Sequence, residues 1–494
     1  MLDPEILGFA AAALSVHNIA AIFTGVAVGL VIGAVPGLSP PMAIALMLPV
    51  SFGLPADTAI ILMVSTYAAG IYGGSFSAIL LRVPGTSASV ASAIEGYELT
   101  RRGRAVEAIR ISTFASVVGG LLSGIALMVL APPLASVSLL FGPSELFFVA
   151  LLGLTSIAAV TSGSVCRGLL AGLAGMYLST IGIDSYSGFP RYTFGATAFE
   201  GGINVLPVIV GLFAFAQGLA LYRGPASGNI AGISSLSWRI WPTWAEILRV
   251  RGSLARGWLT GLVMGLIPAA GASVAQWVTY AWETRHAQPG DRFGRGEIKG
   301  LAATEGSNNG CTGTSLIPMF VIGIPGGMSA VVILGALMVH GLQPGMRLFR
   351  ANPDVVYTIM WGFLFANVVM GFVAAAFARV MAGLTLAPRG VLGPVIVVFC
   401  VIGIYAGTGS AHDLWVMIAF GVVGYFGDRW GFSPAALLLG FILGPIAESG
   451  FRDMMVVSNH NPIPYIMDRP ISLTIVLLIV AALYLAMSRK TSRE

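Results

Sequence analysis

The chain has 494 residues, of which 56% are hydrophobic and only 10% are charged, and its mean hydropathy is +0.88. Soluble domains usually carry about 25% charged residues, so this chain would be insoluble unless lipid surrounded most of it. The formal net charge of +5 comes from basic residues scattered among the loops, which is typical of membrane topology rather than of nucleic-acid binding. The composition therefore indicates an integral membrane protein and excludes a soluble globular one.

The first predicted helix is interrupted where a membrane span would be expected to continue. The sequence there is GLVIGAVPGLSP, residues 29–40, and the helix break is assigned to Pro36 and Gly37. Proline removes an amide donor, and glycine admits conformations that free backbone groups. In hydrocarbon such groups are tolerated only inside protein or beside a watery cavity, so the break favours a binding site. The alternative is a simple kink, which is the commoner cause of a single proline.

A second break is predicted at Pro84, in the polar, glycine-rich run YGGSFSAILLRVPGT, residues 72–86. Arg82 lies just before it, where an unpaired cation in lipid would cost about 3 kcal/mol on the lower of the contested scales. We expect Arg82 to face the substrate cavity, because a guanidinium can bind a carboxylate through two parallel hydrogen bonds. The alternatives are that Arg82 reaches the membrane surface, or that it anchors the chain by pairing with a loop acid such as Glu95.

Apolar runs long enough to cross a membrane recur along the chain, for instance at 110–131, 204–222, 357–381 and 471–487. They predict an all-α polytopic membrane protein with about twelve transmembrane helices. The arginine-rich loop at 95–110 and the basic tail SRKTSRE are expected on the cytoplasmic side. Arg82 is the first arginine or lysine, so the chain lacks the charged region of a cleavable signal peptide and we expect the amino terminus to be retained. The acidic residues Asp3 and Glu5 favour an amino terminus on the outside.

A polar interval in the middle of the chain is interpreted as a linker between two halves. It divides the chain into a first transmembrane repeat (1–222), a polar linker (223–256) and a second repeat with a C-terminal helix (257–494). The second half opens with GLVMGLIPAAGA at 261–272, which repeats the earlier G-L-V-x-G-x-x-P element. It places further helix breaks at Pro268 and Gly271.

The later run NNGCTGTSLIPMFVIGIPGG, residues 308–327, resembles the run that contains Pro84. The match is approximate, because the interval from Ser315 to Pro325 is one residue longer than that from Ser75 to Pro84. Two ordered pairs of breaks favour an internal duplication. Secondary transporters have interrupted helices at matching positions of two repeats, which meet near the midplane and bind substrate and coupling ions. The repeats could be inverted or parallel, depending on the number of spans in each half.

Polar residues beside the breaks form the predicted substrate site. Neutral oxygens and amides can bind an anion and release it again, and helix amino termini add partial positive charge. The candidates are Ser39, Ser75, Arg82, Pro84, Gly85, Thr86, Asn308, Asn309, Thr314, Ser315, Pro325 and Gly326. Freed carbonyls near Asn308 and Asn309 could hold a sodium ion. For each Ser or Thr the alternative is a hydrogen bond to its own helix, and Glu305 could lie either in a cavity or at the membrane surface.

Enzymatic motifs are missing from the sequence. It contains no G-x-x-x-x-G-K-[ST] stretch, and its five histidines and three cysteines are isolated from one another. We therefore expect no enzymatic activity and no cofactor, and the histidines and cysteines form no metal-binding motif. A membrane-embedded enzyme acting on lipid is a disfavoured alternative, because it needs a cluster of Asp, Glu, His or Lys at one interface.

Several motifs together resemble the large membrane subunit of the tripartite tricarboxylate transporters, the TctA-like permeases. They are PGL at 36, YGGSFSAILLRVPGT, the E-x-x-N-N run from Glu305 to Asn309, IPG at 324, HGLQPG at 340 and GFILGPIAE at 440. The resemblance extends over nearly the whole chain. Two departures concern the substrate pocket: the second half has IPAAGA where a further glycine usually follows the proline, and Arg82 stands where Asn is more frequent.

The resemblance implies a permease of the bacterial cytoplasmic membrane that imports a di- or tricarboxylate, or a related organic acid, with sodium or protons as the coupling ion. It also implies two partners, a small four-helix membrane subunit and an extracytoplasmic solute-binding protein that delivers the carboxylate. A passive organic-anion channel or an exporter is the alternative within membrane transport.

Overall fold

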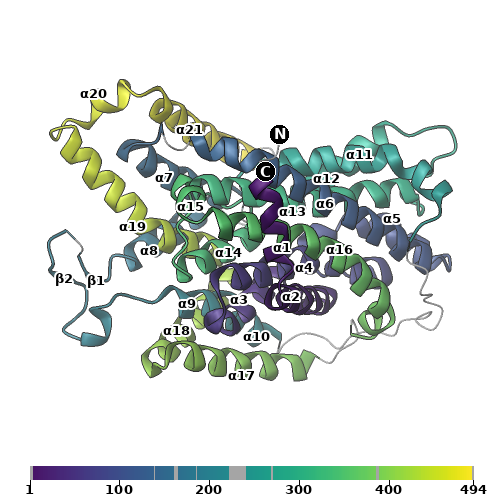
Figure 1. The fold of residues 1–494 in the computed structure, drawn as a ribbon, viewed down its shortest axis with the longest axis horizontal. Coiled ribbons are helices and arrows are strands. Elements are labelled where there is room, and N and C mark those ends of the chain that lie inside the picture. Colours follow the sequence, from purple (N-terminus) through teal and green to yellow (C-terminus); the bar gives the residue numbers. More distant parts are fainter. Residues whose placement is uncertain are drawn as a thin grey trace.

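The computed structural model describes residues 4–137, 140–160, 165–184, 186–221, 241–268, 271–384 and 389–491. Helices make up most of these residues and the strands are few and short (Figure 1), so the prediction of an all-α polytopic membrane protein is confirmed. Six described helices are long and apolar enough to cross a membrane, and further apolar helices are shorter. The number of about twelve spans stays a prediction, because the shorter helices do not each cross a bilayer alone.

The elements of the first half are, in chain order, α1 (Pro4–Ala13), α2 (Val16–Ala34), α3 (Pro40–Val50), η1 (Ser51–Gly53), α4 (Ala56–Leu81), η2 (Ser87–Ser89), α5 (Ser92–Arg101), α6 (Ala105–Val137), α7 (Pro143–Val160), α8 (Val165–Leu178), β1 (Gly182–Ile183), β2 (Pro190–Arg191), η4 (Thr197–Phe199), α9 (Val205–Ile209), η5 (Val210–Phe215) and α10 (Ala216–Leu221). Strands β1 and β2 form a small antiparallel hairpin, and η5 is a π-helical turn that joins α9 to α10.

The elements of the second half are α11 (Trp244–Leu266), α12 (Gly271–Arg285), α13 (Ile298–Ile322), α14 (Met328–Val339), α15 (Met346–Ala351), α16 (Pro353–Leu384), α17 (Arg389–Thr408), α18 (Ala411–Arg429), α19 (Pro434–Val457), α20 (Pro462–Met467) and α21 (Pro470–Thr491).

Helix α11 begins inside the interval that was expected to be a linker. Residues 223–240 of that interval lie outside the described part of the chain. Thr243 caps α11 through a reciprocal pair of hydrogen bonds with Glu246, and Val250 and Leu254 are already buried. The helix therefore starts well before residue 257, where the second repeat was expected to begin, and the division into two repeats stays a prediction.

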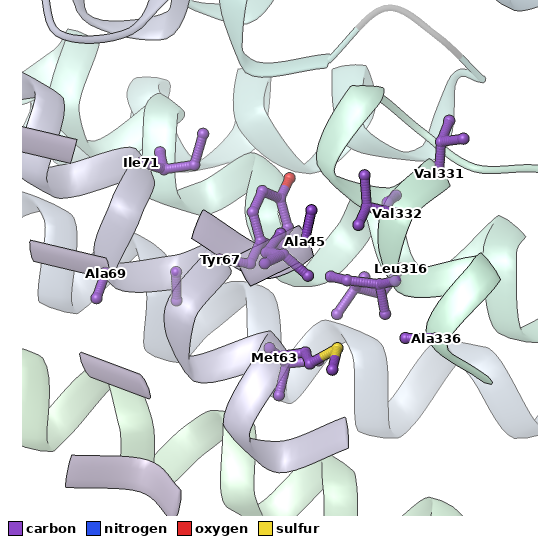
Figure 2. Close-up of a cluster of buried hydrophobic side chains, with 14 of the residues drawn as sticks. Ala45, Met63, Tyr67, Ala69, Ile71, Leu316, Val331, Val332 and Ala336 are labelled. Atoms are coloured by element: carbon purple, nitrogen blue, oxygen red, sulfur yellow. The ribbon is translucent and has the colours of Figure 1, made fainter. Parts of the chain in front are cut away.

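Helices α4 and α13 form the centre of the molecule. The apolar window of α4 is completely buried, and nearly every residue of α13 is buried as well. Figure 2 shows Met63 and Tyr67 of α4 in one buried cluster with Leu316 of α13 and Val332 of α14. A helix that protein encloses on all sides can carry polar groups, because they do not meet lipid.

The glycines of the repeated G-L-V-x-G element allow close packing against these central helices. A Cβ added to Gly29 of α2 would lie 2.5 Å from the carbonyl oxygen of Thr66 on α4. A Cβ added to Gly261 of α11 would lie 2.6 Å from the carbonyl oxygen of Ser307 on α13. Small residues that let helix backbones approach are the usual basis of packing in membranes. The two halves thus use matching glycines for the same contact.

Candidate functional site

The first helix break lies between α2 and α3. Helix α2 ends at Ala34, Val35 leaves helical geometry with φ −84° and ψ 115°, and α3 begins at Pro40. Gly37 has φ 95°, a left-handed conformation that glycine adopts without steric cost. The chain is therefore non-helical across Pro36.

The corresponding segment of the second half has the same backbone geometry. Helix α11 ends at Leu266, and Ile267 has φ −82° and ψ 117°, close to the values of Val35. Pro268 follows, residues 269–270 lie outside the described part, and α12 begins at Gly271 with φ 60°. Helices α2 and α11 therefore end with the same backbone geometry.

The second pair of breaks follows α4 and α13. The amide of Gly85 donates to the carbonyl of Gly74 at 3.2 Å, and the amide of Gly326 donates to the carbonyl of Ser315 at 3.3 Å. In each loop, the glycine after the proline thus binds back to the preceding helix, and the sequence separation between donor and acceptor is the same in both halves. Ser315 therefore corresponds to Gly74, and the one-residue difference seen when Ser75 was matched to Ser315 disappears.

The four breaks belong to one connected group. In the first half, a Cβ on Gly85 would collide with the carbonyl oxygen of Gly33, so the loop after α4 touches the end of α2. In the second half, a Cβ on Gly271 would lie 3.6 Å from the carbonyl oxygen of Gly326. The hydroxyls of Ser87 and Ser273, 2.8 Å apart, join the two halves.

Helices α4 and α13 cross in antiparallel directions between these breaks. The amide nitrogen Nδ2 of Asn309 donates to the carbonyl of Ala68 at 3.2 Å. On either side of that contact, the hydroxyl of Tyr67 lies 3.1 Å from that of Ser315, and Ser75 reaches Glu305. Rising residue numbers on α4 thus meet falling numbers on α13. This geometry supports an inverted rather than a parallel arrangement of the repeats.

Two of the predicted hydroxyls are occupied by contacts that hold the loops. The hydroxyl of Ser39 donates to Oε1 of Gln217 on α10 at 2.9 Å, and Gln217 in turn donates to the carbonyl of Gly37. Thr86 caps η2 in a reciprocal arrangement with Ser89. These contacts stabilise the non-helical backbone beside Pro36 and Pro84, so the hydroxyls are not free for a ligand in this conformation.

Two further candidates on α13 bond to their own helix, as the alternative interpretation proposed. The hydroxyl of Thr314 donates to the carbonyl of Gly310 at 3.1 Å, and that of Ser315 donates to the carbonyl of Thr312 at 2.8 Å. Such bonds satisfy the hydroxyl locally. Thr314 and Ser315 are therefore weaker candidates for substrate contact than the asparagines on the same helix.

Asn308 and Asn309 carry unpaired polar atoms in the interior. Both side chains are fully buried, and neither Nδ2 nor Oδ1 of Asn308 has a hydrogen-bond partner in the described part of the chain. Oδ1 of Asn309 is unpaired as well, although its Nδ2 binds Ala68. A buried polar group without a partner costs about 1–3 kcal/mol. The two residues are therefore the strongest ligand-binding candidates among those predicted.

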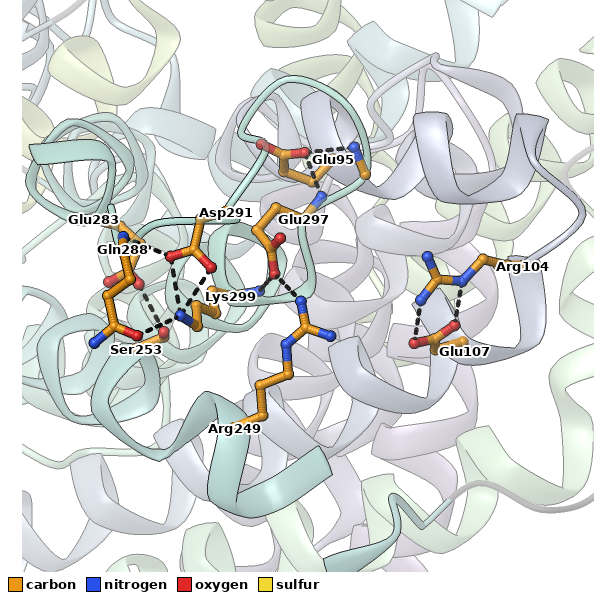
Figure 3. A network of polar contacts seen from close by, with 11 residues as sticks. Glu95, Arg104, Glu107, Arg249, Ser253, Glu283, Gln288, Asp291, Glu297 and Lys299 are labelled. Atoms are coloured by element: carbon orange, nitrogen blue, oxygen red, sulfur yellow. Dashed lines mark hydrogen bonds and ion pairs between the residues drawn. The ribbon is translucent and has the colours of Figure 1, made fainter. Parts of the chain in front are cut away.

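Arg82 forms the end of α4 in a left-handed conformation, with φ 59°. Its guanidinium lies 5.8 Å from the centre of the Tyr97 ring. The pairing with Glu95 that was considered is wrong, because the Glu95 carboxylate accepts hydrogen bonds from the amides of Gly294, Gly296 and Glu297 instead. Figure 3 shows the contact between Glu95 and Glu297. A cation over an aromatic ring is a stabilising contact that leaves the guanidinium edge open.

Glu305 lies in the protein interior, so the alternative that placed it at the membrane surface is wrong. It is completely buried on α13, and Ser75 donates to both of its carboxylate oxygens at 2.8 Å. The E-x-x-N-N spacing places Glu305 one helical turn before Asn308. That spacing was the sequence signal that could have added Glu305 to the predicted site.

The site shows no metal-binding cluster in the described residues, which contain no group of three or more His, Cys, Asp or Glu side chains. The sodium site near Asn308 and Asn309 stays a prediction. A cavity of about 260 Å³ lies elsewhere, beside the β1–β2 hairpin, where Ile183, Met338 and Phe441 line it. None of the predicted site residues lines this cavity.

Comparisons with known proteins agree with the fold and with the motifs. Residues 19–439 match the tripartite tricarboxylate transporter TctA family. The chain is 32% identical, over 97% of its length and 95% of the relative's, to an uncharacterized 52.8 kDa protein in the TAR-I ttuC' 3'region of Agrobacterium vitis. It is 31% identical, over 41% of its length and 83% of the relative's, to an uncharacterized protein in the TAR-II ttuC' 3'region of the same organism. No solved structure matches the chain. The resemblance inferred from the motifs is confirmed, and the chain belongs to the tripartite tricarboxylate transporter TctA family.

Proposed function

We propose that this chain is the permease of a secondary, cation-coupled transporter that imports a di- or tricarboxylate, or a related organic acid, across the bacterial cytoplasmic membrane. A solute-binding protein outside the membrane delivers the acid, and a small four-helix subunit completes the permease. The family supports the role as a transporter membrane subunit. The site, the substrate and the coupling are inferred from the geometry.

The observation that carries the proposal is the pair of unpaired polar atoms on Asn308. Asn308 lies in the helix that crosses α4 between the two pairs of helix breaks. Helices α3, α12 and α14 begin at these breaks, and their amino ends bring partial positive charge toward the interior. The Asn308 amide can donate to a carboxylate without forming an ion pair. A neutral donor of this kind can bind the anion and release it during each cycle.

The distribution of charge supports an orientation with α5 toward the cytoplasm. The carboxyl end of α5 carries Arg101, and the loop before α13 carries Arg292 and Arg295. Glu95 holds that loop against α5 through the Gly294 and Gly296 amides. Figure 1 shows the β1–β2 hairpin at the opposite end of the molecule from α5. Basic loops gather on the cytoplasmic side of membranes, so the hairpin faces outward.

The proposal is tested by counterflow in proteoliposomes that contain the chain with its two partners, with radiolabelled citrate and succinate as probes. We expect Asn308→Ala to weaken the apparent affinity for the transported acid about tenfold, since one good hydrogen bond to a charged group is worth about 1.5–3 kcal/mol. Ser307→Ala is the matched control, because its buried hydroxyl bonds to the carbonyl of Thr304 in the same helix. An unchanged affinity in Asn308→Ala would remove Asn308 from the site, and absence of counterflow would indicate a channel.

A further inference from the structure

Glu305 is a carboxyl group that hydroxyls alone hold in the centre of the molecule. Ser75 of α4 donates to both of its oxygens at 2.8 Å, and Ser116 of α6 donates to Oε2 at 3.0 Å. The side chain is fully buried. The hydroxyls of Ser92 and Ser112 also lie beside the carboxyl. Neutral donors of this kind replace only part of the hydration that an ionised carboxylate loses on burial.

Other buried glutamates in the described residues have stronger partners. Glu283 pairs with Arg256 at 2.6 Å, and Glu145 pairs with Arg469 at 2.8 Å. Glu95 accepts three backbone amides of the loop before α13, in addition to the hydroxyl of Tyr280. Within the described part of the chain, Glu305 contacts neither a cation nor a backbone amide. Its neutral form is therefore better suited to the site than its charged form.

The charged and titratable groups on the elements around Glu305 do not change this conclusion. Tyr72 on α4 bonds to Thr113, Arg110 on α6 pairs with Glu246, and Arg256 on α11 pairs with Glu283 of α12. Glu95 on α5 is bound to the loop before α13. Arg110 and Arg256 are thus already paired with other carboxylates.

We propose that Glu305 carries the coupling proton of the transport cycle, an inference that rests on the proposed function. The O–H bond on the carboxyl forms when a proton enters from outside with the acid, and it breaks when the proton leaves to the cytoplasm. Glu305 precedes Asn308 by one helical turn. A carboxylate at that position repels an incoming organic anion, whereas a protonated carboxyl does not, so the proton and the acid bind together.

A series of polar groups leads from Glu305 toward the face that carries Ser87 and Ser273. Thr304, the residue before Glu305, accepts a hydrogen bond from Ser92 at 3.2 Å, and Gln276 reaches Ser92 at 3.4 Å. The exposed contact between Ser87 and Ser273 lies beyond them, where η2 packs on α12. This series provides hydroxyl and amide groups along which a proton can pass between Glu305 and the exposed helix breaks.

The test compares two modes of transport in proteoliposomes of the chain and its partners. Accumulation of labelled citrate or succinate under an imposed proton gradient requires Glu305 to release its proton, whereas counterflow at equal pH exchanges loaded carriers and does not. Glu305→Gln imitates the permanently protonated state. We expect this variant to lose gradient-driven accumulation at least tenfold while its counterflow stays within about twofold of wild type. Glu107→Gln, which removes a carboxyl from a surface pair on α6, is the control and should retain both activities.

Several results would overturn the proposal. Full gradient-driven accumulation by Glu305→Gln would do so, as would wild-type accumulation that responds to a sodium gradient and not to protons. Loss of counterflow in Glu305→Gln with an unchanged melting temperature would instead assign Glu305 to the substrate. If Glu305→Gln does not fold, Glu305→Asp decides: a proton carrier requires a shifted pH profile of uptake, and an unshifted profile contradicts the proposal. Absence of counterflow by wild type would instead reject the proposed carrier function and indicate a channel.

Discussion

Arg82 and Gly323 occupy the same position at the ends of α4 and α13. Both have left-handed backbones, with φ 59° and 73°, and each donates its amide to the carbonyl four residues earlier, Ala78 at 3.1 Å and Met319 at 3.0 Å. Glycine adopts this conformation freely, whereas a residue with a Cβ is strained in it by about 1–2 kcal/mol. An arginine at such a position indicates that its side chain has a role beyond ending the helix.

We predict that Arg82→Asn weakens transport of the native acid, with Arg82→Lys intermediate. Asparagine tolerates the left-handed conformation, so the end of α4 should remain intact and the melting temperature should not fall. The guanidinium, in contrast, is lost, and with it two hydrogen bonds to a carboxylate. Apparent affinity in counterflow and thermal melting of the purified protein provide the two measurements. An unchanged affinity with a lowered melting temperature would assign Arg82 to a structural role on Tyr97.

A second prediction concerns the close approach of α2 to α4. Gly29→Ala places a Cβ 2.5 Å from the carbonyl oxygen of Thr66, which is backbone and cannot rotate away. We expect the free energy of unfolding to fall by about 1–3 kcal/mol, the usual cost of overpacking. Gly261→Ala should have a similar effect in the second half. Gly8→Ala is the control, because a Cβ there meets no atom within 4 Å; equal melting temperatures of Gly29→Ala and Gly8→Ala would contradict the packing argument.

A third prediction concerns the acid stability of the β1–β2 hairpin. The Ser187 hydroxyl, followed by the Tyr186 amide and the Arg452 guanidinium, holds the pKa of Asp184 at about 2, below its ordinary value of 3.8. Because the folded pKa is lowered, the contribution of Asp184 is complete above the ordinary pKa and is lost as the pH falls through about 2. At pH 3.5 we expect pepsin to cleave the exposed hairpin, which carries Phe189, faster in Asp184→Asn than in wild type.

The comparison at lower pH provides the control for that experiment. Below pH 2 wild-type Asp184 is protonated, so wild type and Asp184→Asn should be cleaved at similar rates. A difference in rate that persists unchanged below pH 2 would show that the carboxylate charge does not hold the hairpin.

A fourth prediction concerns the partners and follows from the proposed function. Cells that produce this chain alone should take up the acid only slightly, because the binding protein delivers the substrate and the small subunit completes the permease. Production of all three proteins should restore saturable uptake. Uptake by the purified chain alone at the rate of the complete system would contradict the tripartite assignment.

The class of protein and the positions of the helix breaks follow from composition and local sequence. Apolar composition requires lipid, and Pro36, Pro84 and Pro325 mark helix breaks because each is followed by a glycine: proline removes an amide donor and glycine frees the backbone. Proline alone is not sufficient, since Pro318 lies inside α13 and Pro445 inside α19. The pairing of the breaks could also be predicted from the sequence, because the two halves contain similar motifs in the same order. These properties belong to a residue and its immediate neighbours.

Which polar groups are free, and which helices meet, depends on the packing of segments that are distant in the sequence. Ser75 looked equivalent to Ser315, yet its hydroxyl binds Glu305, 230 residues away, and Ser315 corresponds to Gly74. Asn308 is distinguished from Thr314 only because the surrounding helices offer it no partner, while Thr314 bonds to its own turn. A hydrogen bond requires two groups at about 3 Å, and the second group comes from whichever distant segment the packing brings there.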